Sequence, residues 1–276
     1  LLGDLISSFP NISLARLEEI GRFRYYQWKG TRQGWFYDKD IDLNREKYSL
    51  FYPSINKAVV IKNKRQADFE DFSLPQLKPG DLLIKVGYVG VCRTDLEVYE
   101  GSLGYYRKGL AQYPIVPGHE FSGTIVGIGA NSKYRERFKI GDRVVGECVL
   151  KRGNDSERRE VGVINYNGAY SQYMVIPGEY VHKIPENLDL KKASLTEPLA
   201  VVLRALRRIR SRINDNDKIA VIGAGPIGNF CTQVLKRENH RVTVFDKNQE
   251  RLSFLKDIVD TAKEISNIRD FNVIIE

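Results

Sequence analysis

Residues 218–228 read Lys-Ile-Ala-Val-Ile-Gly-Ala-Gly-Pro-Ile-Gly, and this stretch decides the layout of the C-terminal part of the chain. An apolar strand over 218–222 runs directly into Gly223-Ala-Gly225-Pro226-Ile227-Gly228, which opens a helix. The first glycine permits a tight turn, the second lets the backbone approach a diphosphate, and the third lets the helix pack on the strand. Since free N–H groups at a helix start attract anions, the stretch predicts a dinucleotide site.

From this stretch to the C-terminus, predicted helices and strands alternate. We expect helices over 226–237 and 249–256 and strands over 241–245 and 272–275, an alternation typical of a parallel α/β sheet. Asp246 follows the second strand, about twenty residues after the glycines, where a carboxylate can accept hydrogen bonds from the adenosine ribose. It would repel a 2′-phosphate, which favours NAD over NADP, although Lys247 weakens that preference. The alternative is that Asp246 only caps the turn into the next helix.

The pattern on the N-terminal side is different. A helix is expected over 193–209, and residues 1–55 form an aromatic and charged block without a chemical motif. Between them, short β-rich runs with glycine and proline punctuation predict a β-barrel-like domain. The expected strands are 57–61, 81–91, 118–128, 143–145, 168–177 and 180–184. The predicted domains are 1–55, an extension of unknown role, then 56–212 and 213–276.

Composition excludes several classes of protein. No window of 18 apolar residues exists, so no membrane span is expected. Three cysteines cannot form a disulfide framework, and with no signal peptide in the opening residues we expect a reduced, cytoplasmic setting. The net charge of +8 includes one dense run, 204–212, which is either a nucleic-acid surface or the solvated face of a helix. We favour the helix face, and expect no nucleic-acid partner.

A thiol, an imidazole and a carboxylate recur in two short motifs. Cys92 lies in Gly-Val-Cys-Arg-Thr-Asp, and His119 and Glu120 lie in Pro-Gly-His-Glu-Phe-Ser-Gly. These groups are suitable zinc ligands, and a catalytic zinc keeps one position open for substrate or water. Taken singly, each has a structural explanation, since a lone cysteine is more often a small buried hydrophobe.

Together, the motifs resemble those of a known family. Residues 118–123, continuing through 129–132, resemble the signature of zinc-containing alcohol dehydrogenases, and 90–95 resembles the family's first ligand segment. Residues 196–200, Thr-Glu-Pro-Leu-Ala, resemble a segment of the sorbitol and threonine dehydrogenase branches. With the nucleotide motif downstream, the order is that of the medium-chain dehydrogenase/reductase superfamily over about residues 57–276. The resemblance implies a GroES-like β-barrel catalytic domain followed by a partial Rossmann NAD-binding domain.

The resemblance also implies one catalytic zinc. Cys92 and His119 would be ligands, Glu120 a third ligand or a close outer partner, and Glu197 an exchangeable fourth. Many relatives carry a second, structural zinc in a lobe of four cysteines. The matching region of this chain has only Cys148, so no structural zinc is expected, and Cys148 is interpreted as an inert thiol.

Four residues near Cys92 acquire roles by the same resemblance. Thr94 would take the proton of the substrate alcohol, Asp95 would orient His119 from behind, and Arg93 would reach the cofactor diphosphate. Glu97 stands where relatives often place the histidine that ends a proton relay, so either this carboxylate serves as a base or the relay runs through water. His182 and His240 lie outside the motifs, and we expect a structural role for the first and a solvated ring for the second.

The implied function is a zinc-dependent, NAD(H)-linked oxidoreductase that acts on a secondary alcohol, polyol or sugar alcohol. Two alternatives are a zinc-free reductase of the same superfamily and a catalytically incomplete binding or interaction protein derived from it. The expected partner is a small-molecule substrate, and the full-length protein is expected to be a homo-oligomer. The chain begins with Leu1 and stops at Glu276 after an apolar strand, so we expect it to be truncated at the C-terminus.

Overall fold

The computed structural model describes residues 53, 55–129, 133–151, 158–264 and 267–276. The chain divides into two compact units at Glu197/Pro198. This division lies earlier than the boundary after residue 212 that the sequence predicts, and the predicted domain ranges stay a prediction. The predicted extension, 1–55, falls outside the described residues except at 53 and 55.

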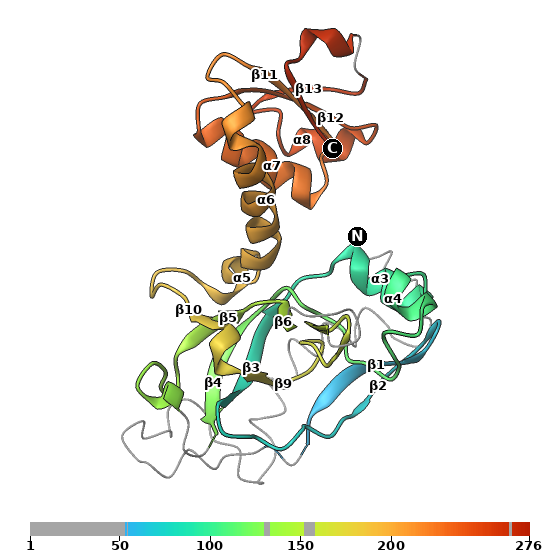
Figure 1. Ribbon diagram of the computed structural model, residues 1–276, viewed down its shortest axis with the longest axis vertical. Helices are drawn as coiled ribbons and strands as arrows, with labels where there is room; N and C mark the ends of the chain where they lie inside the picture. The colour runs from blue at the N-terminus through green and yellow to red at the C-terminus, as the bar shows by residue number, and fades with distance from the viewer. Residues whose placement is uncertain (1–52, 54, 130–132, 152–157, 265–266) are drawn as a thin grey trace. The chain divides into compact units, whose positions relative to one another are not determined.

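The first unit is built on an antiparallel sheet (Figure 1). Its five strands run in the order β10-β5-β4-β3-β9, and every neighbouring pair is antiparallel. In β3, Leu82, Ile84 and Val86 are buried in one apolar cluster, as expected when alternate side chains face a core. The bounds are β3 Asp81–Val89, β4 Phe121–Ile128, β5 Arg143–Gly146, β9 Tyr173–Pro177 and β10 Val181–Lys183.

Two smaller sheets complete the β structure of this unit. Strands β1 (Lys57–Asn63) and β2 (Gln66–Asp71) form a hairpin, and single bridges join Ala58 to Ser171 and Ile61 to Ile115. The other sheet has the order β6-β7-β8. Its bounds are β6 Val149–Lys151, β7 Arg159–Val161 and β8 Asn165–Tyr166. The sequence did not predict β2 or this sheet.

Helix α3 (Arg93–Glu100) was also not predicted, although it carries part of the candidate site. Its N-cap is Cys92, whose N–H donates to Asp95 Oδ2 at 2.9 Å. Its C-cap is Gly101, which has a φ of 64°, a left-handed conformation that favours glycine. A single-turn helix, α4 (Gly104–Arg107), follows.

The helix predicted over 193–209 is two helices. Helix α5 (Leu190–Ala193) is capped by Asp189, whose Oδ1 accepts from the Lys192 N–H at 2.8 Å, and α6 begins again at Thr196 and ends at Ile209. The hydroxyl of Thr196 donates to the Ala193 carbonyl at 2.7 Å, which stabilises the break between them.

Two predicted strands begin later than expected. Strand β4 begins at Phe121 rather than at residue 118, because Gly118 has a φ of 95° and the chain turns there. Strand β9 begins at Tyr173 rather than at 168, because residues 168–170 bond through their N–H groups to the carbonyls of residues 116–118. His119 and Glu120 therefore lie in a loop that is held by backbone hydrogen bonds.

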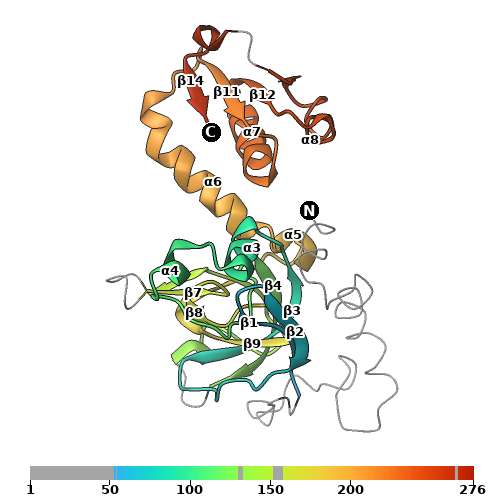
Figure 2. The same cartoon turned by 90° about the vertical axis from the view of Figure 1, so that its right-hand side faces the viewer.

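The second unit has the predicted parallel α/β alternation (Figure 2). Its four strands are all parallel in the order β13-β12-β11-β14, and α7 packs on β11 and β12. Helix α8 ends three residues earlier than the predicted 256, and the short strand β13 was not predicted. The bounds are β11 Lys218–Ile222, α7 Pro226–Arg237, β12 Arg241–Phe245, α8 Gln249–Ser253, β13 Asp260–Ala262 and β14 Val273–Ile275.

Helix α6 buries one stripe and exposes the opposite face. Val202 and Leu206 are buried in the core of the second unit, whereas the arginines at 204, 207 and 208 are exposed. The basic run of the sequence therefore lies on the exposed face of α6 and in the turn that follows it, and the absence of a nucleic-acid partner stays a prediction. Among the described residues, no helix is long and apolar enough to cross a membrane.

The packing of α6 gives a matched test of the fold. We expect Leu206→Ala to lower the free energy of unfolding by about 2–5 kcal/mol, because Leu206 is 3% exposed and its loss leaves a cavity. Leu203 lies on the same helix but is 45% exposed, so Leu203→Ala should change stability by about 0.5 kcal/mol or less. Guanidinium unfolding followed by circular dichroism measures both. Equal effects would contradict the assigned face of α6.

Candidate metal centre and nucleotide loop

The structure brings three predicted zinc ligands together. Cys92 precedes α3, and His119 and Glu120 lie directly before β4. One ligand atom from each of these residues lies within 4.8 Å of the other two. His119 is 5% and Glu120 9% exposed, and Cys92 is half-buried. Two segments that are distant in sequence thus place a thiol, an imidazole and a carboxylate in one small space.

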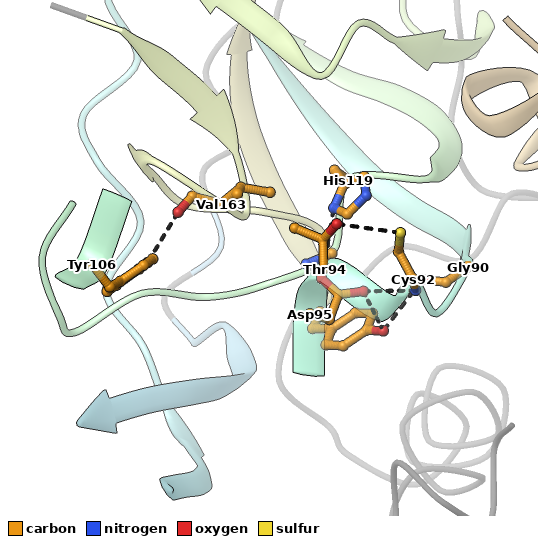
Figure 3. A network of polar contacts seen from close by, with 9 residues as sticks. Gly90, Cys92, Thr94, Asp95, Tyr106, His119 and Val163 are labelled. Atoms are coloured by element: carbon orange, nitrogen blue, oxygen red, sulfur yellow. Dashed lines mark hydrogen bonds and ion pairs between the residues drawn. The ribbon is translucent and has the colours of Figure 1, made fainter. Parts of the chain in front are cut away.

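Asp95 joins these two segments (Figure 3). Its carboxylate is fully buried and accepts three hydrogen bonds. The donors are the Cys92 N–H at 2.9 Å, the Gly118 N–H at 3.1 Å and the Tyr170 hydroxyl at 3.2 Å. The first donor begins α3, the second precedes His119, and the third lies in the bend before β9. The sequence gives no signal for the part that Tyr170 takes.

His119 has the least satisfied side chain of the site. Its Nδ1 lies 3.6 Å from Asp95 Oδ1, which is longer than a hydrogen bond, and it has no other partner among the described residues. This nitrogen faces Asp95, the carboxylate behind the ring, so it is not the atom that would bind a metal ion. Zinc bonds of about 2.0–2.3 Å separate ligand atoms by about 3.5 Å, so a cluster of this size fits a small metal ion after slight contraction.

Burial and the neighbouring charges shift the pKa values of the site residues in opposite directions. Burial lowers the pKa of His119, but the Asp95 carboxylate and the Cys92 sulfur outweigh burial and hold that pKa well above its ordinary value. Burial raises the pKa of Glu120, an effect that the charge of His119 reduces and that of Glu197 increases. The site therefore gathers several carboxylates around one imidazole in a water-poor space, an arrangement that a bound cation would stabilise.

A missing side chain at Gly90 makes room for Glu120. A Cβ atom built on Gly90 would lie 2.2 Å from Glu120 Oε2, and the Gly90 N–H donates to the Glu120 carbonyl at 2.7 Å. The Tyr170 hydroxyl also lies 3.3 Å from the Gly90 carbonyl. The sequence motif around Cys92 gives Gly90 no role. The contact between the two segments shows that Gly90 leaves room for the side chain of Glu120.

The remaining predicted residues lie at different distances from this cluster. The Thr94 hydroxyl is 3.6 Å from Cys92 Sγ. Arg93 is exposed and lies 3.8 Å from Glu97 Oε1, so Glu97 contacts a neighbouring turn of α3 rather than the cluster. Glu197 is half-buried and is not one of the three clustered ligands. Burial raises its pKa, and the charge of His119 lowers it.

Cys148, His182 and His240 lie outside the motifs. Burial raises the pKa of Cys148 to about 12, so this thiol stays protonated at neutral pH. His182 is exposed, and its Nε2 lies 2.9 Å from Glu147 Oε1. His240 is half-buried, and its Nδ1 is covered and without a hydrogen-bond partner among the described residues, so the ring that the sequence predicts to be solvated is only partly exposed.

The nucleotide loop connects β11 to α7. Gly223 has a φ of 97°, and its N–H donates to the Phe245 carbonyl at 2.7 Å. A Cβ atom on Gly228 would lie 1.8 Å from the Gly223 carbonyl oxygen, whereas one on Gly225 would meet nothing within 4 Å. Pro226 is the first residue of α7, and Ile227 is 48% exposed. The glycines therefore perform separate tasks: a turn, an open approach and a close helix contact.

Asp246 is bonded to this loop. Its Oδ2 accepts from the Ala224 N–H at 2.8 Å, and its Oδ1 accepts from the Asn248 N–H at 2.8 Å. These bonds, led by that from Asn248, hold the pKa of Asp246 below its ordinary value. Arg251 lies 3.7 Å from Oδ2 and, with Gly225 and Ile227, lines a pocket of about 430 Å³. Asp246 does cap the turn, which leaves its role toward a ribose a prediction.

Known proteins are similar to this chain in sequence and in fold. Residues 78–186 match the family model of the alcohol dehydrogenase GroES-like domain. D-arabitol-phosphate dehydrogenase of Enterococcus avium is 33% identical over 217 residues, which is 72% of this chain and 59% of that protein. The chain thus spans about three fifths of the length of the curated relatives that it matches.

Solved structures confirm the predicted fold class of a GroES-like domain followed by part of a Rossmann domain. An alcohol dehydrogenase of E. coli CFT073 complexed with NADH has a TM-score of 0.67 at 28% identity, covering 78% of this chain and 64% of that one. 2R,3R-butanediol dehydrogenase from Bacillus subtilis has a TM-score of 0.66 at 28% identity, covering 77% and 65%. Residues 78–186 thus match the alcohol dehydrogenase GroES-like domain, and in sequence and fold the chain is similar to zinc-type medium-chain alcohol dehydrogenases.

Proposed function

We propose that the protein is a zinc-dependent, NAD(H)-linked oxidoreductase that converts a secondary alcohol, polyol or sugar alcohol to a ketone. The observation that carries this proposal is the gathering of Cys92, His119 and Glu120 within 4.8 Å, in a chain that also has an open nucleotide loop. A zinc-free reductase would have no use for a thiol, an imidazole and a carboxylate gathered in one space. The relatives' names, a pentitol-phosphate and a butanediol dehydrogenase, support a small diol or polyol as substrate.

We assign Cys92, His119 and Glu120 to one catalytic zinc, with Glu197 as an exchangeable fourth ligand. When bound, such an ion acts as a Lewis acid on the alcohol oxygen and lowers its pKa. Asp95 positions His119 and, through the Cys92 N–H, the start of α3. A carboxylate behind a metal-bound histidine fixes the orientation of the ring, which agrees with the complete burial of Asp95.

Thr94 is the group that we assign to the alcohol proton. Its hydroxyl lies 3.6 Å from Cys92 Sγ, and a hydroxyl can accept one proton while donating its own. Glu97 lies one turn further along α3 and contacts Arg93, so it can serve as the base at the end of this route only if that contact opens. Otherwise the proton leaves through water. We keep both routes, and Arg93 stays the proposed cation for the cofactor diphosphate.

We propose NAD rather than NADP as the cofactor. The open space at Gly225 suits a diphosphate, and Asp246 is an ionised carboxylate that would repel a 2′-phosphate. Arg251 beside Asp246 and the neighbouring Lys247 reduce that repulsion without removing it. We further infer a reduced, cytoplasmic setting from the three free cysteines, and a homo-oligomeric full-length protein.

Metal content tests the ligand assignment. We expect about one zinc per chain in the purified protein and a large loss in Cys92→Ala, because a ligand is removed. Cys231→Ala is the control, because Cys231 is a free cysteine that lies outside the cluster, in α7. Elemental analysis after dialysis gives the count. Equal zinc in the parent and in Cys92→Ala, or none in either, would remove the proposed centre.

The contact at Gly90 gives a second test of the centre. In Gly90→Ala the new methyl group would displace Glu120, so zinc affinity should fall by about 10–100-fold while Cys92 and His119 are unchanged. Gly104→Ala is the control, because a Cβ atom there meets nothing within 4 Å. Competition with a chromophoric chelator measures the affinity. If Gly90→Ala binds zinc like the parent, Glu120 is not a ligand.

The two glycines at 225 and 228 separate cofactor binding from folding. Gly225→Ala should leave the melting temperature unchanged, because its Cβ meets no atom of the chain, yet weaken NADH binding by tenfold or more, at least about 1.4 kcal/mol, by occupying the diphosphate approach. Gly228→Ala should lower the melting temperature as well, since its Cβ would lie 1.8 Å from the Gly223 oxygen. NADH fluorescence titration and thermal melts measure these effects. Unchanged NADH affinity in Gly225→Ala would argue against the assigned approach.

A further inference from the structure

Tyr170 is packed tightly against the loop that precedes His119, and it is 8% exposed. Its N–H donates to the Pro117 carbonyl at 2.9 Å, and its carbonyl accepts from the Val59 N–H at 2.8 Å. A Cβ atom on Gly118 would lie 2.5 Å from its ring, so a larger residue would not fit between the ring and the loop. The side chain of Tyr170 is therefore held in one position relative to the loop.

The hydroxyl of Tyr170 faces two acceptors with a single proton. Its oxygen lies 3.2 Å from Asp95 Oδ2 and 3.3 Å from the Gly90 carbonyl oxygen. A phenol has one O–H donor, so the two acceptors share it. Burial and the charge of Asp95 hold the pKa of Tyr170 well above its ordinary value, so the phenol keeps its proton at neutral pH. The hydroxyl is thus a lasting donor between a carboxylate and a carbonyl.

Asp95 connects this hydroxyl to His119. The Cys92 N–H and the Tyr170 hydroxyl both donate to Oδ2, and Oδ1 lies 3.6 Å from His119 Nδ1. Without the hydroxyl, Oδ2 would keep only the Cys92 N–H among the donors that the structure describes. The carboxylate, and with it the imidazole ring, would then be held less firmly.

The second acceptor lies beside Glu120. The Gly90 N–H donates to the Glu120 carbonyl at 2.7 Å, and a Cβ atom on Gly90 would overlap the Glu120 carboxylate. The Tyr170 hydroxyl therefore bonds to one group behind His119 and to another in the segment that makes room for Glu120. One phenol thus joins the supports of two proposed ligands.

We propose that Tyr170 is a positioning residue of the metal centre, which acts through Asp95 on His119 and so raises the affinity of the site for zinc. The proposal rests on the proposed function. The hydroxyl would act without binding the ion, by stabilising the carboxylate in the orientation that directs Oδ1 toward the imidazole. Partners behind metal ligands contribute about 10–100-fold to metal affinity, and Tyr170, one contact further out, should contribute at the lower end of this range.

Metal binding by the full-length protein tests the proposal without turnover. In Tyr170→Phe, which keeps the ring, we expect the Kd for zinc to rise about tenfold, measured by competition with a chromophoric chelator. The visible absorption of Co²⁺ bound in place of zinc should also change, because the imidazole is oriented less firmly.

Tyr106→Phe is the matched control. The Tyr106 hydroxyl donates to the Val163 carbonyl at 3.0 Å, a bond that Figure 3 shows apart from those around Asp95. Both variants lose one hydrogen bond to the backbone or a side chain and should melt at a lower temperature, so only the metal readouts separate them. In Tyr106→Phe the zinc Kd should change by about twofold or less, and the Co²⁺ spectrum should stay as in the parent.

A double mutant tests the route through Asp95. In an Asp95→Asn background, Tyr170→Phe should change the zinc Kd by about twofold or less, because residues that act through one another are not additive. A further loss as large as that in the parent background would overturn this route.

The remaining outcomes separate this proposal from the proposed function. An unchanged zinc Kd and Co²⁺ spectrum in Tyr170→Phe would overturn the positioning role and leave the proposed function standing. Equal weakening of zinc binding in Tyr170→Phe and Tyr106→Phe would mark a general loss of stability and overturn the role as well. A parent protein that binds no zinc would overturn the metal centre itself, and the positioning role with it.

Discussion

The geometry of the candidate metal centre depends on one buried carboxylate, that of Asp95. Its three donors come from the start of α3, the loop before β4 and the bend before β9. A fully buried carboxylate without hydrogen-bond donors destabilises a fold, so the three segments that meet here stabilise one another through Asp95. Cys92 and His119 are positioned as a consequence, because each is the immediate neighbour of a segment that Asp95 holds.

Close backbone contacts make this meeting possible. Gly118 has a left-handed backbone, and a Cβ atom there would lie 2.5 Å from the ring of Tyr170. Gly168 and Gly162 approach the same loop, where Cβ atoms would lie 2.3 Å from the Gly118 oxygen and 2.6 Å from its nitrogen. Side chains at these positions would push the loop outward and separate the imidazole from the thiol. The centre is thus formed as much by the absence of side chains as by the ligands themselves.

The sequence predicted the elements whose structure depends on residues close together in the chain. The strand–loop–helix at 218–228 and the parallel alternation after it follow from neighbours in sequence, and the structure has both. Helix α3 is the exception among the local elements: Asp95 and Gly101 mark its two ends, yet the sequence pattern did not predict it. Tyr170 carried no signal, since its bond to Asp95 joins segments far apart in sequence. The cluster of Cys92 with His119 was predicted from a family resemblance rather than from the residues alone.

The bonds of Asp246 have a consequence for how cofactor choice can evolve. The carboxylate that we propose to read the ribose also holds the glycine loop, through the Ala224 N–H, and the following turn, through the Asn248 N–H. A single exchange of Asp246 for a small neutral residue would relieve the repulsion of a 2′-phosphate and release both backbone segments at once. Asp246 would therefore serve both cofactor recognition and loop structure. A change from NAD to NADP preference would require new hydrogen-bond acceptors for the two N–H groups elsewhere in the loop.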